Sequence, residues 1–337
     1  MESVKRVLII RFSSIGDILL TTPFIRQTRI AFYNAKIDFV VKKKFFELIQ
    51  YNPHLNTIFT FDDQAGLKGL LALRKKIKAR NYDYILDLHN NIRSRILTFN
   101  LPAKIYRMKK NKFKRALLVY FKINLFREVI PVPEKYLNVG RPLGIKDDSQ
   151  GLELFWKDRN VKTLRFKLKN DFLHGKMIAI APGAGFQTKQ WPIEYFRKLI
   201  QLIEDEGHYK IILLGNAVEA ESFRPLVTSE RVLNLAGKLS LLETAYVLNK
   251  AKFVVSNDSG VMHMAAAVRT PVLAIFGSTV KEFGFFPYRA KSIVMENNNL
   301  WCRPCSHVGR KRCPLFHFKC MKSIPPQMVF NQLKNWM

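Results

Sequence analysis

The sequence is short of acidic residues. Only 26 Asp and Glu stand against 56 Lys and Arg in 337 residues, which gives a formal net charge of +30. An excess of this size predicts association with polyanions: nucleic acid, an anionic membrane surface or a phosphorylated substrate. A nucleic-acid-binding protein would show aromatic residues along a basic stripe, or a helix-turn-helix. Neither is present, because the basic residues are dispersed, and we expect no nucleic-acid partner.

Long apolar runs are also lacking. No stretch approaches the ~20 consecutive apolar residues of a membrane span. The N-terminus leads directly into a short predicted strand, without the apolar run and cleavage site of a signal peptide. We therefore expect a cytoplasmic protein. Its 48% of hydrophobic residues and its length suffice for two domains, each with its own core.

Cysteine is scarce and confined to the C-terminal segment, with the spacing C-x2-C-x7-C-x6-C. In a cytoplasmic chain such a cluster favours a metal over disulfides. The spacing nevertheless departs from the usual two-pair zinc pattern. The sequence leaves open a structural metal or a thiol-rich, locally packed loop. The residues concerned are Cys302, Cys305, Cys313 and Cys320.

The common nucleotide-binding motifs are missing at the places where they would be expected. No G-x-G-x-x-G follows the first predicted strand, which argues against a dinucleotide-dependent dehydrogenase. The glycine loop at 182–192 does not match G-x-x-x-x-G-K-[ST] either.

Strands and helices alternate in both halves of the chain, a pattern typical of parallel sheets covered by helices. We expect two domains, 1–150 and 151–337, with a Pro- and Gly-containing connection within 130–170. In the first half we predict strands at 6–12, 36–41, 56–61, 84–88 and 105–108, and helices at 17–32, 67–79 and 113–121. In the second half we predict strands at 177–181, 210–214, 232–235, 253–256 and 272–276, and helices at 191–206, 217–226, 240–249 and from 325.

Polar residues follow two strands of the first half, and strand ends line the ligand crevice of such folds. Gly16 permits a tight turn, and the Asp17 carboxylate is placed to accept a proton from a sugar hydroxyl or simply to cap the next helix. The second cluster would bind an anionic acceptor, or would be the basic start of a surface helix. It consists of His89, Asn90, Arg93 and Arg95.

Three strand-end clusters of the second half suit a nucleotide diphosphate. The glycine loop Pro182–Gly185 followed by Lys189 offers backbone donors and a cation, although Lys189 would also suit an exposed turn. Glu219 is placed to accept hydrogen bonds from a ribose, with Glu221 as a competitor. The Asp258-Ser259-Gly260 run and His263 begin a helix whose N-terminus favours an anion, unless the two polar side chains only cap it.

Three segments resemble motifs of glycosyltransferase family 9, the lipopolysaccharide heptosyltransferases. They are Arg11–Pro23, Lys189–Pro192 and Asn257–His263, in the family's order, and the resemblance spans residues 6 to about 285. The cysteine segment from Cys302 to Met321 is similar to a tail found in many members.

The resemblance implies an α/β protein of the GT-B fold, with two Rossmann-like domains whose parallel sheets face across a cleft. The domain at 1–150 would bind the acceptor, the Kdo or heptose of the lipopolysaccharide inner core. The domain at 151–337 would bind ADP-L-glycero-β-D-manno-heptose. Transfer would invert the anomeric carbon and require no cofactor or catalytic metal. A different sugar nucleotide or acceptor is the alternative within the family. With its charge, we expect the protein to be peripheral on the cytoplasmic face of the inner membrane.

The resemblance also implies roles for single residues. Asp17 would be the catalytic base and Lys189 would contact the ADP phosphates. The nucleotide sugar would be bound by Gly183, Ala184, Gly185, Lys189, Glu219, Asp258, Ser259, Gly260, Val261 and His263. The acceptor would be bound by Ser14, His89 and Arg93. Members often carry glutamine at the position of His89 and lysine at that of Arg93, and both differences concern the acceptor.

Overall fold

The computed structural model describes residues 4–162, 164, 168, 172, 176–207 and 209–337. Its contacts divide the chain into two compact units. The first comprises 1–110 and 131–156, and the second comprises 111–130 and 157–337. This division differs from the expected boundary after residue 150, because 111–130 packs with the later half of the chain. The expected connection at 130–170 lies partly outside the described residues.

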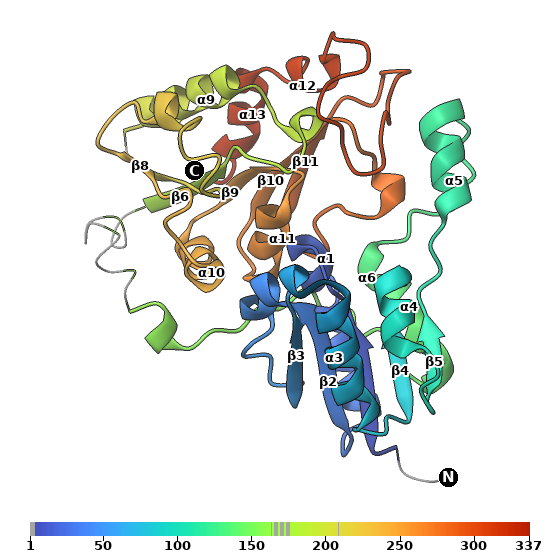
Figure 1. Cartoon of the computed structure of the whole chain (residues 1–337). Coiled ribbons are helices and arrows are strands. Elements are labelled where there is room, and N and C mark those ends of the chain that lie inside the picture. Colours follow the sequence, from blue (N-terminus) through green and yellow to red (C-terminus); the bar gives the residue numbers. More distant parts are fainter. Residues whose placement is uncertain (1–3, 163, 165–167, 169–171, 173–175, 208) are drawn as a thin grey trace. The chain divides into compact units, whose positions relative to one another are not determined.

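The first unit is built on a sheet of five parallel strands in the order β3-β2-β1-β4-β5 (Figure 1). β1 is central, and its residues 7–10 are fully buried, as a strand covered on both faces requires. The strands are β1 (Arg6–Ile10), β2 (Lys36–Lys42), β3 (Thr57–Phe61), β4 (Tyr84–Asp87) and β5 (Lys104–Arg107).

The helix predicted at 17–32 is two helices, α1 (Ile15–Leu19) and α2 (Thr22–Ala31). The Thr21 hydroxyl donates to the carbonyl of Ile18 at 2.6 Å, and Pro23 occupies the first turn of α2, where its missing N–H costs nothing. The remaining helices of this unit are α3 (Gly66–Lys78), α4 (Ile92–Thr98) and α6 (Val132–Gly140), with short 3₁₀ turns η1 (Lys43–Leu48), η2 (Asp63–Ala65) and η4 (Arg141–Leu143).

The second unit contains a sheet of six parallel strands in the order β11-β10-β9-β6-β7-β8. The edge strand β11 was not predicted. The strands are β6 (Lys176–Ala181), β7 (Tyr209–Leu213), β8 (Val232–Asn234), β9 (Val254–Asn257), β10 (Val272–Phe276) and β11 (Ser292–Glu296). The helices are α9 (Ile193–Asp205), α10 (Leu241–Lys250), α11 (Gly260–Ala267), α12 (Lys319–Lys322) and α13 (Pro326–Lys334), and α9 and α13 pack together (Figure 1). Short turns are η5 (Asp158–Asn160), η6 (Gln187–Lys189), η7 (Arg224–Leu226) and η8 (Lys281–Phe283).

The helix predicted at 217–226 is wrong, because the segment forms turns that end in η7. Asn216 Oδ1 accepts the backbone N–H groups of Val218 and Glu219 at 2.9 and 3.1 Å. Such local side-chain bonds compete with helix formation. Pro225 also brings no amide hydrogen to the segment.

The segment 111–130 forms α5 (Lys112–Ala116), which continues into the π-helical turn η3 (Leu117–Phe121). Leu118 and Val119 pack against Phe283 of the second unit. The helix predicted at 113–121 is therefore confirmed, but it belongs to the second unit rather than completing the first. None of the helices in the described part of the chain is both long and apolar enough to cross a membrane.

Candidate active site

Loops from neighbouring strands meet at the carboxyl edge of the second sheet. Ala181 at the end of β6 lies opposite Ser256 of β9, and Asn257 lies opposite Ile275 of β10. The loops that follow these three strands are therefore adjacent, and the loop after β7 lies next to that of β6. In open parallel sheets this edge is where ligands bind.

Lys189 and Asp258 form a partly enclosed ion pair at this edge. The Lys189 ammonium lies 2.7 Å from Asp258 Oδ2, which also accepts a 2.7 Å hydrogen bond from the Thr279 hydroxyl. The Lys189 side chain is only 16% exposed, which is not the environment of an ordinary surface lysine. The Lys189 cation is thus held at the start of α11. Thr279 is not among the residues predicted from the sequence.

The N-terminus of α11 is open to an anion. Ser259 occupies the N-cap position in extended backbone conformation and makes no side-chain cap. Its hydroxyl lies instead 3.1 Å from that of Ser256. Because the first turn keeps its backbone donors, the helix end carries positive partial charge next to Lys189. His263 is buried within this helix, while Val261 in its first turn is half-buried.

Glu219 lies directly against the glycine loop. A Cβ at Gly183 would approach Glu219 Oε1 to 2.1 Å, so only glycine leaves room for the carboxylate. The backbone N–H of Asn216 donates to Glu219 Oε2 at 2.9 Å. Burial raises the pKa of Glu219 in spite of this hydrogen bond. The glycine loop is closed by Gln190, whose side-chain amide donates to the Ala184 carbonyl at 2.8 Å, while Gly185 faces open space.

Asn257 connects two of these loops. The sequence alone did not single it out as a site residue. It is fully buried, accepts the Trp191 backbone N–H at 3.0 Å and donates to the Pro182 carbonyl at 2.6 Å. The bonds fix the two ends of the segment that carries Lys189. The available signal was its position at the head of the Asn257–His263 motif.

Hydrogen bonds from the cysteine segment support the loops of the same site. The backbone N–H of Thr188 donates to the Arg310 carbonyl at 3.1 Å, and that of Arg310 donates to the Thr188 hydroxyl at 2.8 Å. Arg303 is buried and donates to the carbonyls of Gly277 and Thr279, both at 2.6 Å, besides contacting the Glu296 carboxylate. Arg303 therefore fixes the loop that presents Thr279 to Asp258.

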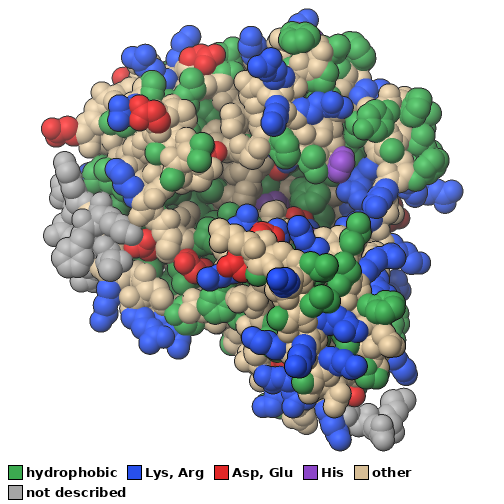
Figure 2. Space-filling view, viewed as in Figure 1, with side chains coloured by type: hydrophobic (Ala, Val, Ile, Leu, Met, Phe, Trp, Pro, Cys, Tyr) green, Lys and Arg blue, Asp and Glu red, His purple; other side chains and the backbone are tan. Residues whose placement is uncertain are grey.

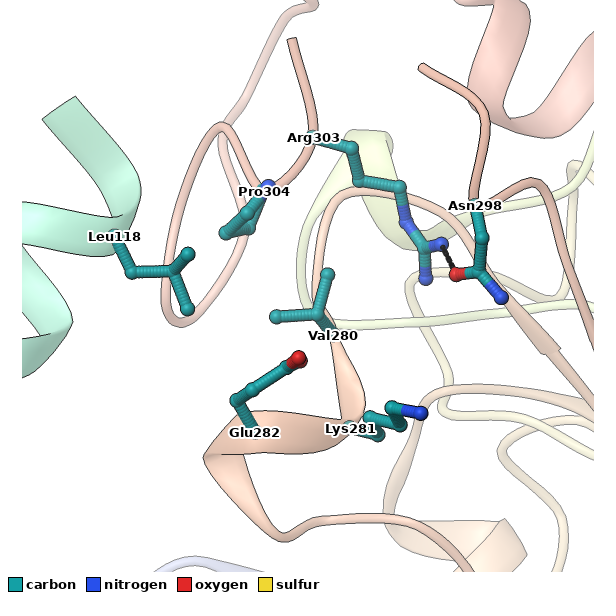
Figure 3. Close-up of a pocket in the computed structure, with 7 residues that line it drawn as sticks. All are labelled: Leu118, Val280, Lys281, Glu282, Asn298, Arg303 and Pro304. Atoms are coloured by element: carbon teal, nitrogen blue, oxygen red, sulfur yellow. Dashed lines mark hydrogen bonds between the residues drawn. The ribbon is translucent and has the colours of Figure 1, made fainter. Parts of the chain in front are cut away.

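A hollow of about 320 Å³ lies beside Arg303, and Leu118 and Pro304 help to line it (Figure 3). Within it, Arg303 Nη1 donates to Asn298 Oδ1 at 2.7 Å. The hollow therefore lies between Arg303, which supports the loops at the sheet edge, and segment 111–130.

The four cysteines are free thiols that line a second hollow of about 210 Å³, together with His317. Cys302 Sγ lies 3.8 Å from His317 Nε2. Burial raises the pKa of Cys305 and, to about 12, that of Cys320. Among the residues with described positions, no three His, Cys, Asp or Glu side chains form a metal-binding group. The described residues accordingly offer no ligand set for the structural metal that the sequence left open.

In the first unit, Asp17 follows β1 and pairs with Arg11. Arg11 Nη2 lies 2.6 Å from Asp17 Oδ1, and the Ser14 hydroxyl and backbone N–H donate to Asp17 Oδ2 at 2.9 and 3.1 Å. Arg11 is in turn fixed by the carbonyls of Ser13 and Leu88, each at 2.8 Å. The sequence named Arg11 within a motif but gave it no role.

These contacts keep Asp17 ionised. Burial alone would raise the pKa of Asp17, but the charge of Arg11 and the two hydrogen bonds from Ser14 outweigh it and lower the pKa below its usual range. The bond from the Ser14 N–H also means that Asp17 caps the first turn of α1, which was the alternative considered from sequence. The capping contact is thus present, and the role of Asp17 as catalytic base stays a prediction.

The β4–α4 loop places His89 near Asp17, because β4 is the neighbour of β1. Buried Asp87 shapes the loop by accepting the backbone N–H groups of His89 and Asn90 at 3.0 and 2.7 Å. Burial, reinforced by the charge of Arg11, lowers the pKa of His89 to about 3, so its ring is neutral at pH 7. Arg93, on the first turn of α4, is exposed.

Two α/β units, each built on a parallel sheet with polar residues at its strand ends, have the architecture of the GT-B fold, which similar solved structures share. The model of "Glycosyltransferase family 9 (heptosyltransferase)" matches residues 70–315. The chain therefore belongs to this family and is a glycosyltransferase. The matched range contains every nucleotide-site residue named above, while Asp17 precedes it.

Individual relatives agree with this assignment. The chain is 27% identical over 331 residues to lipooligosaccharide heptosyltransferase 2 of Campylobacter jejuni, covering 95% of both chains. The crystal structure of a family 9 glycosyltransferase from Veillonella parvula matches with a TM-score of 0.80 and 23% identity, covering 100% of this chain and 98% of that one. An Escherichia coli heptosyltransferase solved with ADP matches with a TM-score of 0.72 and 23% identity, over 98% of this chain and 100% of that one. The same enzyme was also solved with ADP-2-deoxy-2-fluoro heptose.

Proposed function

We propose that the protein transfers heptose from ADP-L-glycero-β-D-manno-heptose to the Kdo or heptose of a lipopolysaccharide inner core, with inversion at the anomeric carbon. The observation that carries the proposal is the Lys189–Asp258 pair beside the uncapped N-terminus of α11. The Lys189 ammonium and the helix N-terminus both offer positive charge to a diphosphate at one sheet edge. The relatives solved with ADP and with an ADP-heptose analogue support this choice of donor.

The remaining strand-end residues would recognise the nucleoside. Glu219, in the loop after β7, would accept hydrogen bonds from the ribose hydroxyls, as acids do in related sheets. Asp258 holds Lys189 in position and would share it with the phosphates once the donor binds. Thr279 keeps the Asp258 carboxylate oriented during this exchange.

In the proposed reaction, an acceptor hydroxyl oxygen bonds to the anomeric carbon as the bond from that carbon to the ADP phosphate oxygen breaks. The hydroxyl proton passes to Asp17, and the electron pair of the broken bond leaves with ADP. Lys189 and the α11 N-terminus would stabilise the negative charge that develops on ADP, each by about 3 kcal/mol. Because these groups supply the positive charge, the proposal needs no metal or other cofactor.

The acceptor would be bound by the first unit through Ser14, His89 and Arg93. Arg93 is an exposed cation suited to the acidic groups of an inner-core sugar. The neutral ring of His89 offers one donor and one acceptor to a sugar hydroxyl. Such an acceptor is carried by a glycolipid, so we propose that the protein acts as a peripheral protein on the cytoplasmic face of the inner membrane.

A transfer assay with defined acceptors tests the proposal. The purified protein is given ADP-heptose and a set of truncated lipopolysaccharides, and the products are weighed by mass spectrometry. We expect the mass of one heptose to be added to one member of the set, and NMR of that product to show the opposite anomeric configuration to the donor. ADP-glucose serves as the control donor, since its transfer instead of heptose would point to another sugar nucleotide. Failure with every acceptor and both donors would contradict the proposal.

A further inference from the structure

Most of the exposed large hydrophobic side chains described in the second unit lie in two segments, 111–130 and 301–316. Phe113 is 71% exposed, Trp301 75% and Phe316 85%. Single exposed apolar residues are ordinary, but a contiguous group marks an interaction surface. The full set is Phe113, Tyr120, Phe121, Ile123, Leu125 and Val129 in the first segment and Trp301, Val308, Leu315 and Phe316 in the second.

The two segments form one surface. The Lys122 ammonium donates to the carbonyls of Pro304 at 2.7 Å and Cys302 at 3.2 Å, which ties the segments together. Tyr120 and Trp301 line the same 210 Å³ hollow from opposite segments. We call the exposed side of segments 111–130 and 301–316 the basic-aromatic surface.

The inner side of the first segment is already occupied by the protein itself. Leu118 and Val119 are buried against Phe283, and Figure 3 shows Leu118 facing Val280 and Pro304. The aromatic residues on the other side of the same helix therefore do not serve its attachment. One face of this helix attaches it to the protein and the other face exposes aromatic side chains. Such a helix is suited to contact a further apolar surface.

The charge of this surface is strongly one-sided. Segment 111–130 contains five Lys or Arg and one Glu, and segment 301–316 contains four Lys or Arg and no acid. The residues Lys112, Lys114, Lys311 and Arg312 are exposed among the aromatics. Figure 2 shows hydrophobic and basic side chains beside one another over α5, at the right of the view.

We propose that the basic-aromatic surface docks on a bilayer with anionic headgroups. Aromatic side chains insert at the headgroup boundary, and Lys and Arg pair with lipid phosphates. The strength of such binding grows with the apolar area that is buried and with the attraction to anionic lipids, and this surface offers both. The inference rests on the proposed function, because a glycolipid acceptor places the reaction at a membrane.

Co-sedimentation of the full chain with vesicles tests the charge contribution. We expect binding to vesicles of mixed phosphatidylcholine and phosphatidylglycerol, and little binding to phosphatidylcholine alone. In the variant, Lys112, Lys114, Lys311 and Arg312 are replaced by Gln. Each replacement should weaken binding about five-fold, the equivalent of roughly 1 kcal/mol for a basic residue near an anionic surface.

A matched control variant removes the same net charge elsewhere. It carries Lys→Gln at the exposed positions 68, 75, 76 and 78 of α3 in the first unit. The control should bind the mixed vesicles nearly as the unchanged protein does. An equal loss in both variants would overturn the proposal, because it would show that net charge alone governs binding.

The apolar contribution has its own test. The triple variant Phe113→Ser, Phe121→Ser and Phe316→Ser should lose vesicle binding at physiological salt, where charge alone is screened. The equally exposed Ile30, Tyr33 and Phe99 of the first unit provide the control triple. Emission from Trp301 should shift to the blue on mixed vesicles, and the shift should be absent from Trp301→Phe. Unchanged emission together with unchanged binding of the first triple would overturn the proposal.

Two further outcomes separate this proposal from its alternatives. If the Lys and Arg variant loses binding to a duplex oligonucleotide but keeps its binding to vesicles, the surface is a nucleic-acid site and the proposal fails. Transfer to a soluble truncated acceptor without vesicles should be unaffected in the Lys and Arg variant and in the Phe triple variant. Vesicle binding with no transfer in any assay would uphold the docking surface and contradict the proposed function instead.

Discussion

Asp17 makes a structural ion pair and, in the proposed reaction, takes the acceptor proton; a substitution can separate the two roles. Asp17→Asn keeps the shape and the acceptor oxygen for Ser14 but removes the negative charge that would take the proton. A positioned base contributes about 100- to 10,000-fold to the rate, so transfer under single-turnover conditions should fall within that range. A variant that transfers heptose at the original rate would show that another group is the base.

The same substitution leaves Arg11 without its partner, which must be controlled. Loss of one member of an enclosed ion pair destabilises a protein by about 3–5 kcal/mol. Urea unfolding of Asp17→Asn therefore accompanies the rate measurement, and rates are compared where both proteins are folded. Ser14→Ala retains the Arg11–Asp17 pair and should cost much less in rate, because the carboxylate keeps its charge.

His89 gives a pH dependence of stability with a definite sign. The folded protein holds its imidazole neutral down to a pKa of about 3, while the unfolded chain binds a proton below about pH 6.5. The unfolded state therefore gains protons first as the pH falls, and the free energy of unfolding decreases between pH 6.5 and pH 3. From pH 7 to pH 5, His89 should account for a loss of about 2 kcal/mol.

The substitution His89→Gln tests this value, because glutamine fills a similar volume and does not titrate. Urea unfolding at pH 7 and pH 5 should show a smaller loss of stability in the variant, by about 2 kcal/mol. Parallel losses in both proteins would mean that His89 is protonated in the folded state. The acceptor preference can be compared in the same pair, since position 89 is where this chain departs from its family resemblance.

The strand-end residues could be predicted from sequence because their types and order reflect the chemistry of an anion site. What joins them could not be predicted. Thr279 and Arg303 act through contacts with distant segments, and a sequence does not show which buried groups meet. Asn257 lay in a recognised motif, but its two bonds to separate loops depend on the packing of β9 between β6 and β10.

At the scale of elements, regular apolar patterns predicted the buried strands of both sheets. Local side-chain interactions account for the elements that differ from the prediction. The half-buried β11 lacks the continuous apolar run of the central strands. A threonine hydroxyl bond and Pro23 divided the first helix, and Asn216 turned the expected helix after β7 into a series of turns. Segment 111–130 was assigned to the wrong half because its partner Phe283 is remote in sequence.

The glycine loop after β6 provides a test at this scale. Gly183→Ala would place a methyl group 2.1 Å from Glu219 Oε1, so either the loop or the carboxylate must move. We expect ADP affinity to fall about ten-fold, as for the loss of one charged hydrogen bond. Gly185→Ala is the comparison in the same loop: its added Cβ meets no protein atom within 4 Å, so a loss of affinity there would report contact with the ligand rather than with Glu219. Calorimetric titration with ADP compares the two, and equal affinities would exclude a close fit between the loop and Glu219.

For the whole molecule, the residues of the proposed reaction belong to two different units. The carboxylate Asp17 belongs to the first, and Lys189 and Asp258 belong to the second. A ligand that binds only through the second unit should therefore be indifferent to changes at Asp17. This independence distinguishes a true nucleotide site from general attraction of phosphate to a protein with a net charge of +30.

Thermal unfolding with ADP measures this independence. At 100 times its dissociation constant, ADP should stabilise the protein by about 2.7 kcal/mol, because it binds the folded state alone. Asp17→Asn should retain that stabilisation, whereas Lys189→Gln should bind ADP about 10- to 100-fold more weakly, through the loss of a charged contact with the phosphates. Lys210→Gln, on β7 of the same unit, removes the same charge away from the loops and serves as the control. If the two lysine variants respond alike, or if inorganic pyrophosphate stabilises the protein as much as ADP does, positive charge rather than a built nucleotide site explains the binding.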